Sequence, residues 1–323
     1  MFYGGENMKK IGLSVYMINV HSKNMKQKYI NINEIYNNKS FVDIVEEFLN
    51  EMKGAYDRDD ESENIFTTVK TDRTDKKDKD GRPDYKCIFG QIKTGDYGTA
   101  SELVDSRTGK VSHNKTSNEA EVIPFVFGML IPAGDRDNGI IIFQTEGRFG
   151  MKSSFEKRLR KYILEKYPDI DFNMGALLPT EYIEKVMKRG VLEKIKLICF
   201  QAPLDTRKAL SVNEGIEIKE ERIYYGPTGF IGKKKDAILG FLHGKNGLKE
   251  IIADENFIYD EMKMEFKIGN RKRTFNLNNI SKIVPIIDIT KEMEGRGDHP
   301  EYALVKSEIR KNALEFLEEV RTS

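Results

Sequence analysis

Short apolar runs of strand length, separated by turn residues, constrain the fold of this chain more than any other feature. The two strongest runs are Ile123–Ile131 and Ile140–Gln144, and the stretch between them opens with Pro132–Asp135, whose composition is typical of a turn. Apolar residues also alternate from Ile11 to Met17, which predicts a strand with one buried face. The chain is therefore expected to contain several paired strands.

Helical periodicity is confined to a few segments. Apolar residues from Phe41 to Met52 recur three and four positions apart, which predicts an amphipathic helix. Ser40 is positioned to cap this helix, and Asp43 follows in its first turn. A second helix is expected to open at Ser153, where Glu156 would complete a capping box.

This mixture predicts an α+β fold with largely antiparallel sheets, a few amphipathic helices and two domains. A length of 323 residues is sufficient for two domains, and a polar, glycine-rich stretch places a boundary near residue 205. The predicted domains are 1–204 and 205–323, with a basic hairpin over 257–277 and a closing helix in the second.

The segment Asp57–Asp84 is predicted to be an exposed and mobile excursion of the first domain. Its charges alternate in sign and it ends in a glycine-containing turn, a pattern typical of a hairpin tip. Its composition offers little apolar surface to bury in a core.

No catalytic or metal-binding constellation is recognisable in the sequence. Neither a Gly-x-Ser-x-Gly elbow nor a phosphate-binding Gly-x-x-x-x-Gly-Lys-Ser/Thr loop is present, and the four histidines lack the spacing of zinc ligands. The nearest approach to a nuclease motif, Asp84 with Gln91–Lys93, carries Gln where a catalytic Glu is needed. No catalytic residue, metal or cofactor is therefore assigned, and a non-enzymatic role is favoured.

Three features predict a cytoplasmic protein that does not insert into a membrane. No apolar run approaches the roughly 18 residues of a membrane-spanning helix. The segment Met1–Lys10 lacks the basic and apolar regions of a secretory signal. Only two cysteines occur, Cys87 and Cys199, and both lie in apolar runs, as expected of buried thiols in a reducing compartment.

Basic residues are concentrated in three clusters, although the whole chain is almost neutral, with 53 basic and 52 acidic residues. Local clusters of this kind can contact the phosphate backbone of DNA. The candidate DNA-binding residues are Arg148, Lys152, Lys157, Arg158, Arg160 and Lys161 in the first cluster, Lys233, Lys234 and Lys235 in the second, and Lys267, Arg271, Lys272 and Arg273 in the third. The alternatives are a solvated helix face, a flexible basic loop and an edge hairpin protected by its charge.

In contrast to these basic clusters, the stretch Asp43–Glu63 is acidic, with nine acidic and two basic residues. Separation of charge on this scale suits either the binding of a polyanion on one face or self-association of basic with acidic surfaces.

Three patterns follow one another along the chain. They are Ile123–Phe127 leading through Gly147–Gly150 into a helix, a short helix over Leu178–Gly190 feeding a strand, and a closing strand pair and helix over Phe257–Val320. In this order they resemble the RexA family of phage-exclusion proteins. The likeness extends over most of the chain but only as a pattern of elements.

The resemblance implies a bacterial, homodimeric, non-enzymatic protein that binds double-stranded DNA with little sequence preference. Its function would be antiviral defence by phage exclusion or abortive infection, together with a second defence protein encoded nearby. The alternative hypothesis is a protein–protein interaction or sensor subunit of a defence complex, assembled through charge-asymmetric surfaces. An unrecognised nuclease is the third.

Overall fold

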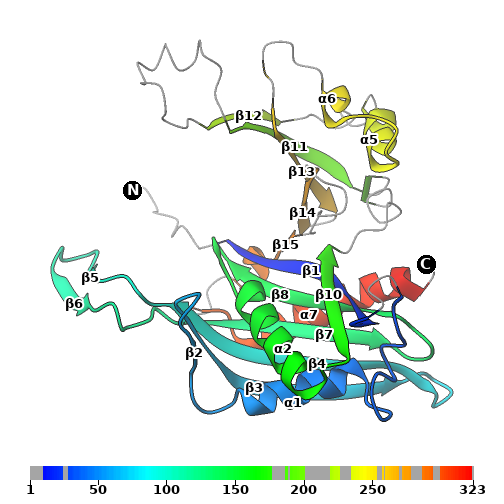
Figure 1. Cartoon of the computed structure of the whole chain (residues 1–323). Helices are drawn as coiled ribbons and strands as arrows, with labels where there is room; N and C mark the ends of the chain where they lie inside the picture. The colour runs from blue at the N-terminus through cyan, green and yellow to red at the C-terminus, as the bar shows by residue number, and fades with distance from the viewer. Residues whose placement is uncertain are drawn as a thin grey trace. The chain divides into compact units, whose positions relative to one another are not determined.

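The computed structural model describes residues 10–24, 28–176, 186–187, 190–200, 219–225, 234–252, 257, 259–268, 271–277, 286–293 and 299–321. As predicted, the fold is α+β, with strands in largely antiparallel sheets (Figure 1). The chain divides into two compact units. The first comprises Met1–Leu13, Met17–Met174 and Thr290–Ser323, and the second comprises Ser14–Tyr16 and Gly175–Ile289.

One sheet forms the framework of the first unit, with the strand order β1-β8-β7-β4-β3-β2. The bounds are β1 Ile11–Ser22, β2 Asp57–Asp59, β3 Asn64–Lys77, β4 Pro83–Asp96, β7 Ile123–Pro132 and β8 Asn138–Glu146. In addition, β10, Ile170–Ala176, pairs with β1, and β9, Phe149–Gly150, pairs with β8. The two strands predicted most strongly from the sequence, β7 and β8, therefore lie inside the sheet.

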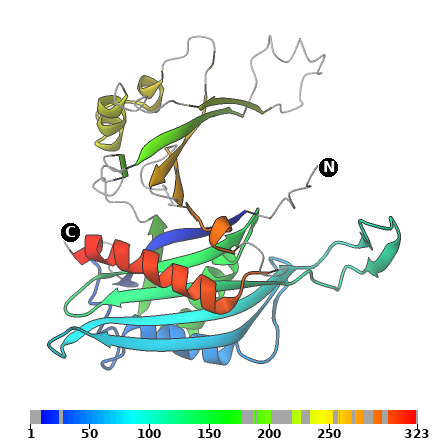
Figure 2. The ribbon, with the colours of Figure 1, turned by 180° about the vertical axis from the view of Figure 1, so that it is seen from behind.

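Helices cover both faces of this sheet. The helices α1, Phe41–Glu51, and α2, Lys152–Lys166, lie on one face, and α7, Tyr302–Arg321, lies on the other against β7 and β8 (Figures 1 and 2). Both strands are consequently buried along almost their whole length. Continuous apolar runs, rather than alternating ones, are what strands covered on both faces require.

Aromatic rings form the core between the sheet and the first two helices. The ring centroid of Phe155 on α2 lies 4.9 Å from that of Phe127, 5.3 Å from that of Phe143 and 5.6 Å from that of Phe48. None of these four side chains is more than 1% exposed. Aromatic pairs at such distances contribute about 0.5–1.5 kcal/mol each beyond the burial of their surface.

The starts of the two helices differ in how well the sequence predicted them. Ser40 and Asp43 form the expected capping box of α1, and the backbone N–H of Ser40 donates to Asp43 Oδ2 over 2.6 Å. The capping box expected at Ser153 is wrong. The helix α2 begins one residue earlier, at Lys152, and the carboxylate of Glu156 forms an ion pair with Lys152 instead.

The segment Asp57–Asp84, expected to be an exposed excursion, is regular strand over most of its length, although more than half of its residues are exposed. It contains β2 and β3, and β3 pairs antiparallel with β4 along its length. Phe66, Thr67 and Thr68 are buried there, whereas residues 60–63 between the two strands and residues 75–83 at the tip are exposed throughout. Charged side chains of β3 form ion pairs with α1 and α7, and composition alone did not predict these contacts. The mobility of the segment stays a prediction.

The second unit contains a sheet with the strand order β12-β11-β13-β14-β15. The bounds are β11 Val191–Cys199, β12 Glu220–Tyr225, β13 Glu261–Ile268, β14 Arg271–Asn276 and β15 Ile286–Asp288, with α5 over Lys235–Leu242 and α6 over Leu248–Ile251. The predicted hairpin is present, since β13 pairs antiparallel with β14, and its turn at 269–270 lies outside the described residues. Met262, Met264 and Phe266 form its buried face, as their alternation predicted.

Neither unit begins or ends at the expected boundary near residue 205. Residue 205 itself lies outside the described residues. The closing helix α7 belongs to the first unit. Its buried side chains include Val305, Ile309 and Phe316, and the helix contacts β7 and β8. The predicted division into 1–204 and 205–323 therefore separates this helix from the strands that it covers.

Close packing at Gly95 on β4 yields a stability prediction. A Cβ atom at this position would lie 1.9 Å from the backbone oxygen of Glu121, which no side-chain movement can relieve. We expect Gly95→Ala to lower the free energy of unfolding by about 1–3 kcal/mol or more, measured by urea denaturation. Gly150→Ala is the control, because its nearest contact would be Thr145 Cγ2 at 3.5 Å. Equal stability of the two variants would contradict this account of the packing.

Candidate functional site: ion-paired clusters and an exposed hairpin

The basic residues of the first cluster lie on and beside α2, where most of them form ion pairs with acidic side chains. Lys157 Nζ lies 2.8 Å from Asp59 Oδ2 and 2.7 Å from Glu61 Oε2. The hydrogen bond from Lys157 holds the pKa of Asp59 well below its usual range. Lys152 and Arg160 both pair with Glu156. Their positive charges are thus matched within the protein.

Arg158 is buried, with its side chain 4% exposed. Its Nε donates to Asp57 Oδ2 over 2.7 Å, and its Nη1 and Nη2 donate to Asn64 Oδ1 and to the Asn64 carbonyl over 3.1 and 3.0 Å. Ser154 and Thr94 belong to the same network. A guanidinium held in this way joins α2 to β2 and β3 and is not accessible to a DNA phosphate in this arrangement.

Two residues of the first cluster remain available to a ligand. Arg148 and Lys161 are exposed, and no ion pair joins either of them to another described residue. The guanidinium of Arg148 lies over the ring of Phe149, 5.0 Å from its centroid. Lys161 lines a cavity of about 310 Å³ together with Asp57, Asp59 and other acidic and basic residues.

The basic residues of the β13–β14 hairpin are also paired where they are described. Lys267 Nζ lies 3.7 Å from Glu193, and Lys272 Nζ lies 2.9 Å from Glu193 and 3.1 Å from Glu265. The hydrogen bond that Lys272 donates to Glu193 raises the pKa of Lys272. The side chains of Arg271 and Arg273 lie outside the described residues. This hairpin therefore carries less free positive charge than its sequence indicates.

Of the three-lysine cluster, Lys233 and the side chain of Lys235 lie outside the described residues. Lys234 immediately precedes α5 and is partly exposed. The structure thus leaves this cluster largely untested.

The acidic stretch supplies the partners of Lys157 and Arg158, whereas Lys152 and Arg160 pair with Glu156. Besides Asp57, Asp59 and Glu61, which pair with α2, the carboxylates of Asp43 and Glu46 lie 2.6 and 2.7 Å from Arg73 Nη1. The charge separation seen along the sequence is therefore largely cancelled by folding. This cancellation weakens both hypotheses drawn from the charge separation, which were polyanion binding on one face and self-association of basic with acidic surfaces.

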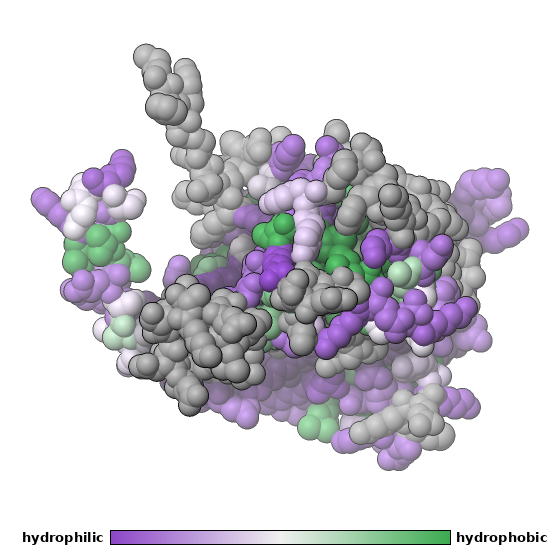
Figure 3. All heavy atoms as spheres, turned by 90° about the horizontal axis from the view of Figure 1, so that it is seen from above, coloured by the Kyte–Doolittle hydropathy of each residue, from purple (hydrophilic) through white to green (hydrophobic). Residues whose placement is uncertain are grey.

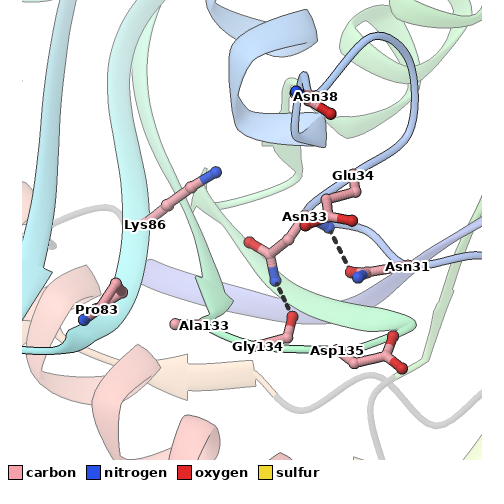
Figure 4. Close-up of a pocket in the computed structure, with 9 residues that line it drawn as sticks. All are labelled: Asn31, Asn33, Glu34, Asn38, Pro83, Lys86, Ala133, Gly134 and Asp135. Atoms are coloured by element: carbon pink, nitrogen blue, oxygen red, sulfur yellow. Dashed lines mark hydrogen bonds between the residues drawn. The ribbon is translucent and has the colours of Figure 1, made fainter.

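A polar pocket of about 700 Å³ lies beside β4 and the turn that follows β7 (Figure 4). Asn33 Nδ2 donates to the carbonyl oxygens of Pro132 and Gly134 over 2.8 and 3.0 Å, which fixes the orientation of the carboxamide. Its Oδ1 is buried without a hydrogen-bond partner in the described structure. Lys86 also lines the pocket. The pocket offers an acceptor and a cation, and its lining holds no nucleophile paired with a base.

An exposed hairpin is the feature that sequence reasoning missed. The strands β5, Ser101–Val104, and β6, Val111–Lys115, form a separate two-stranded sheet, here called the arm. Leu103, Val104 and Val111 are 45%, 50% and 48% exposed. Figure 3 shows apolar side chains gathered on the arm between hydrophilic ones. These three residues flank a polar turn in the sequence, and that pattern was the available signal.

The arm has a regular, hydrogen-bonded structure and is not an irregular loop. At its turn, Asp105 Oδ1 accepts hydrogen bonds from the backbone N–H groups of Arg107 and Thr108, both over 2.9 Å. At its base, the N–H of Gly98 donates to the carbonyl of Ser117 over 2.7 Å. The apolar side chains are therefore presented in a defined conformation.

Comparison with known proteins adds no assignment. No protein-family model matches the chain, and no curated protein matches it. The resemblance to the RexA family therefore stays a prediction. Within the described ranges, no three His, Cys, Asp or Glu side chains are grouped so that they could hold a metal ion, and no helix is long and apolar enough to cross a membrane.

The buried network predicts a large stability effect for Arg158. We expect Arg158→Met to lower the free energy of unfolding by about 2–4 kcal/mol, because it removes the hydrogen bonds that Arg158 donates to the Asp57 carboxylate and to the side chain and carbonyl of Asn64. Lys157→Met is the control, since a pair with an exposed lysine contributes about 0–1 kcal/mol. Urea denaturation measures both. Similar losses for the two variants would show that Arg158 does not act as the buried connection described here.

The ion pairs also predict how any binding of duplex DNA will respond to substitution. We expect Lys157→Ala to leave the affinity unchanged, because Asp59 and Glu61 already neutralise this lysine. The double variant Asp59→Asn/Glu61→Gln frees the lysine, and it should strengthen binding and steepen the log–log salt slope by up to about 0.9. A salt-titrated binding assay with duplexes of unrelated sequence tests this. Weaker binding by Lys157→Ala alone would show that the lysine contacts phosphate despite its partners.

Proposed function

We propose that this protein acts by association with another protein chain, and that the arm forms the contact. The observation that carries the proposal is the exposure of Leu103, Val104 and Val111 on a separate, ordered two-stranded sheet. The first partner is a second copy of this chain. This choice agrees with the homodimer that the RexA resemblance implies.

Two physical arguments support an interface at the arm. A two-stranded sheet is only marginally stable by itself, and its unpaired edges present backbone groups to which another strand can bind. Burial of the exposed half of three aliphatic side chains would contribute roughly 2–4 kcal/mol for each arm. In a symmetric dimer the same surface is used twice, so this contribution doubles.

The charge of the arm permits self-association. Residues 101–115 contain two acidic and three basic side chains, so two arms would not repel each other strongly. The apolar residues lie at the end of the arm nearest its turn, where Val104 pairs with Val111 and Leu103 with His113. An approaching partner therefore meets the apolar surface between polar rims, as in the core and rim of known interfaces.

Binding of double-stranded DNA and a role in phage exclusion rest on the resemblance to the RexA family. They stay predictions, and the ion pairs around the first and third basic clusters give DNA binding less support than assembly receives. Arg148 and Lys161 are the residues through which the first cluster would still contact a phosphate.

The proposal predicts a change of oligomeric state. We expect the parent protein to form a dimer and the variant Leu103→Ser/Val111→Ser to raise the dimer dissociation constant by roughly 30-fold or more, since a loss of 1.4 kcal/mol corresponds to tenfold. Light scattering coupled to size exclusion, over a range of concentrations, measures this constant.

Arg107→Ser/Lys110→Ser is the matched control, because both residues are exposed and lie at the turn of the same arm. It should dimerise like the parent. A parent protein that stays monomeric at every accessible concentration, or a Leu103→Ser/Val111→Ser variant that dimerises normally, would contradict self-association through the arm.

A further inference from the structure

One group of basic residues outnumbers the carboxylates that lie beside it. Lys70 on β3 and Lys306 and Arg310 on α7 line a cavity of about 340 Å³, together with Asp72, Tyr302 and Ser307. We call it the α7 pocket. The lining residues on β3 and those on α7 are more than 200 positions apart in the sequence. The pocket therefore cannot be predicted from a local cluster of charge.

The α7 pocket carries an excess of positive charge. Three bases face a single carboxylate, that of Asp72, whose Oδ2 lies 2.9 Å from Lys306 Nζ. Neither Lys70 nor Arg310 forms an ion pair with another described residue. The pocket therefore has a local net charge of +2, whereas the bases on α2 and on the β13–β14 hairpin are largely neutralised.

Aromatic rings and one acid hold these cations in place. Lys70 Nζ lies 4.8 Å from the ring centroid of Tyr302, and the Arg310 guanidinium lies 5.1 Å from that of Phe89. The hydroxyl of Tyr302 donates to Asp72 Oδ2 over 2.7 Å, so this carboxylate is engaged by two donors. Lys306 gives one of its three N–H donors to Asp72 and keeps the others for a ligand.

Arg310 shows an unmet hydrogen-bonding capacity. Its Nε is buried and has no hydrogen-bond partner in the described structure. An unsatisfied donor of this kind is unfavourable, and a small turn of the guanidinium toward a bound oxyanion would satisfy it. The planar set of donors on arginine matches the oxygens of a phosphate.

We propose that the α7 pocket binds the phosphoryl group of a small phosphate monoester. Lys70, Lys306 and Arg310 supply the charge, the hydroxyl of Ser307 supplies a further donor, and Asp72 positions Lys306. A monoester carries a charge of about −1.5 to −2 at neutral pH, which matches the pocket better than the single charge of each phosphodiester in a nucleic acid. The cavity volume is near the lower end for small-molecule sites, so the group attached to the phosphate is small.

Isothermal titration of the full chain with inorganic phosphate and with glycerol phosphate tests the proposal. We expect both to bind, and Lys70→Gln and Arg310→Gln each to weaken binding by about tenfold or more. Lys70 is exposed and outside any ion pair, so its substitution should leave the fold intact and keeps the test valid if Arg310→Gln does not fold. Lys157→Gln, which removes an ion-paired base on α2, should bind like the parent.

A competition measurement distinguishes the possible sources of the phosphate group. A short DNA duplex is added as a competitor for glycerol phosphate. The duplex could displace glycerol phosphate at a lower concentration of phosphate groups than inorganic phosphate does. That result would assign the pocket to a nucleic-acid backbone and overturn the monoester assignment. Absence of phosphate binding, or binding that Lys70→Gln leaves unchanged, would overturn the site itself. Neither result depends on the oligomeric state of the arm variants.

Discussion

Burial of β7 and β8 on both faces is the constraint on which the first unit depends. Their uninterrupted apolar side chains require a covering layer on each side of the sheet. On one side, Phe155 of α2 and Phe48 of α1 pack together over Phe127 and Phe143. On the other side, α7 covers both strands. The unit is therefore completed by residues from both ends of the sequence, and the second unit is an insertion between them.

A second organising interaction is the pairing of acidic and basic side chains across elements. The buried Arg158 connects α2 to β2 and β3, and Arg73 connects β3 to α1 through Asp43 and Glu46. These contacts use the charges that would otherwise produce a strongly basic and a strongly acidic surface. The apolar surface of the arm and the basic α7 pocket differ in chemistry and suit different ligands.

The sequence predicted those elements whose stabilising contacts are local or repeat with a fixed period. The helix over 41–51 with its Ser40 cap, the strands β7 and β8 and the closing helix follow from capping chemistry and apolar spacing. In the segment 57–84 the sequence did not predict β2 and β3, because charged residues of these strands pair with residues far away along the chain. Asp72 contacts Tyr302, 230 positions away, and Arg73 contacts Asp43, 30 positions away. No local pattern carries that information.

By itself the sequence determined the α+β class, the central strands and the positions of most helices, because periodicity along the chain dictates which face of an element is buried. Only the tertiary structure decided which charges are free. Four of the six bases of the first cluster, contiguous in sequence, are paired with carboxylates of the acidic stretch or of α2 itself, whereas Lys70, Lys306 and Arg310, scattered in sequence, meet in one pocket. The physical reason is that electrostatic interaction depends on distance in space, which for residues far apart along the chain is set by the packing of the whole fold.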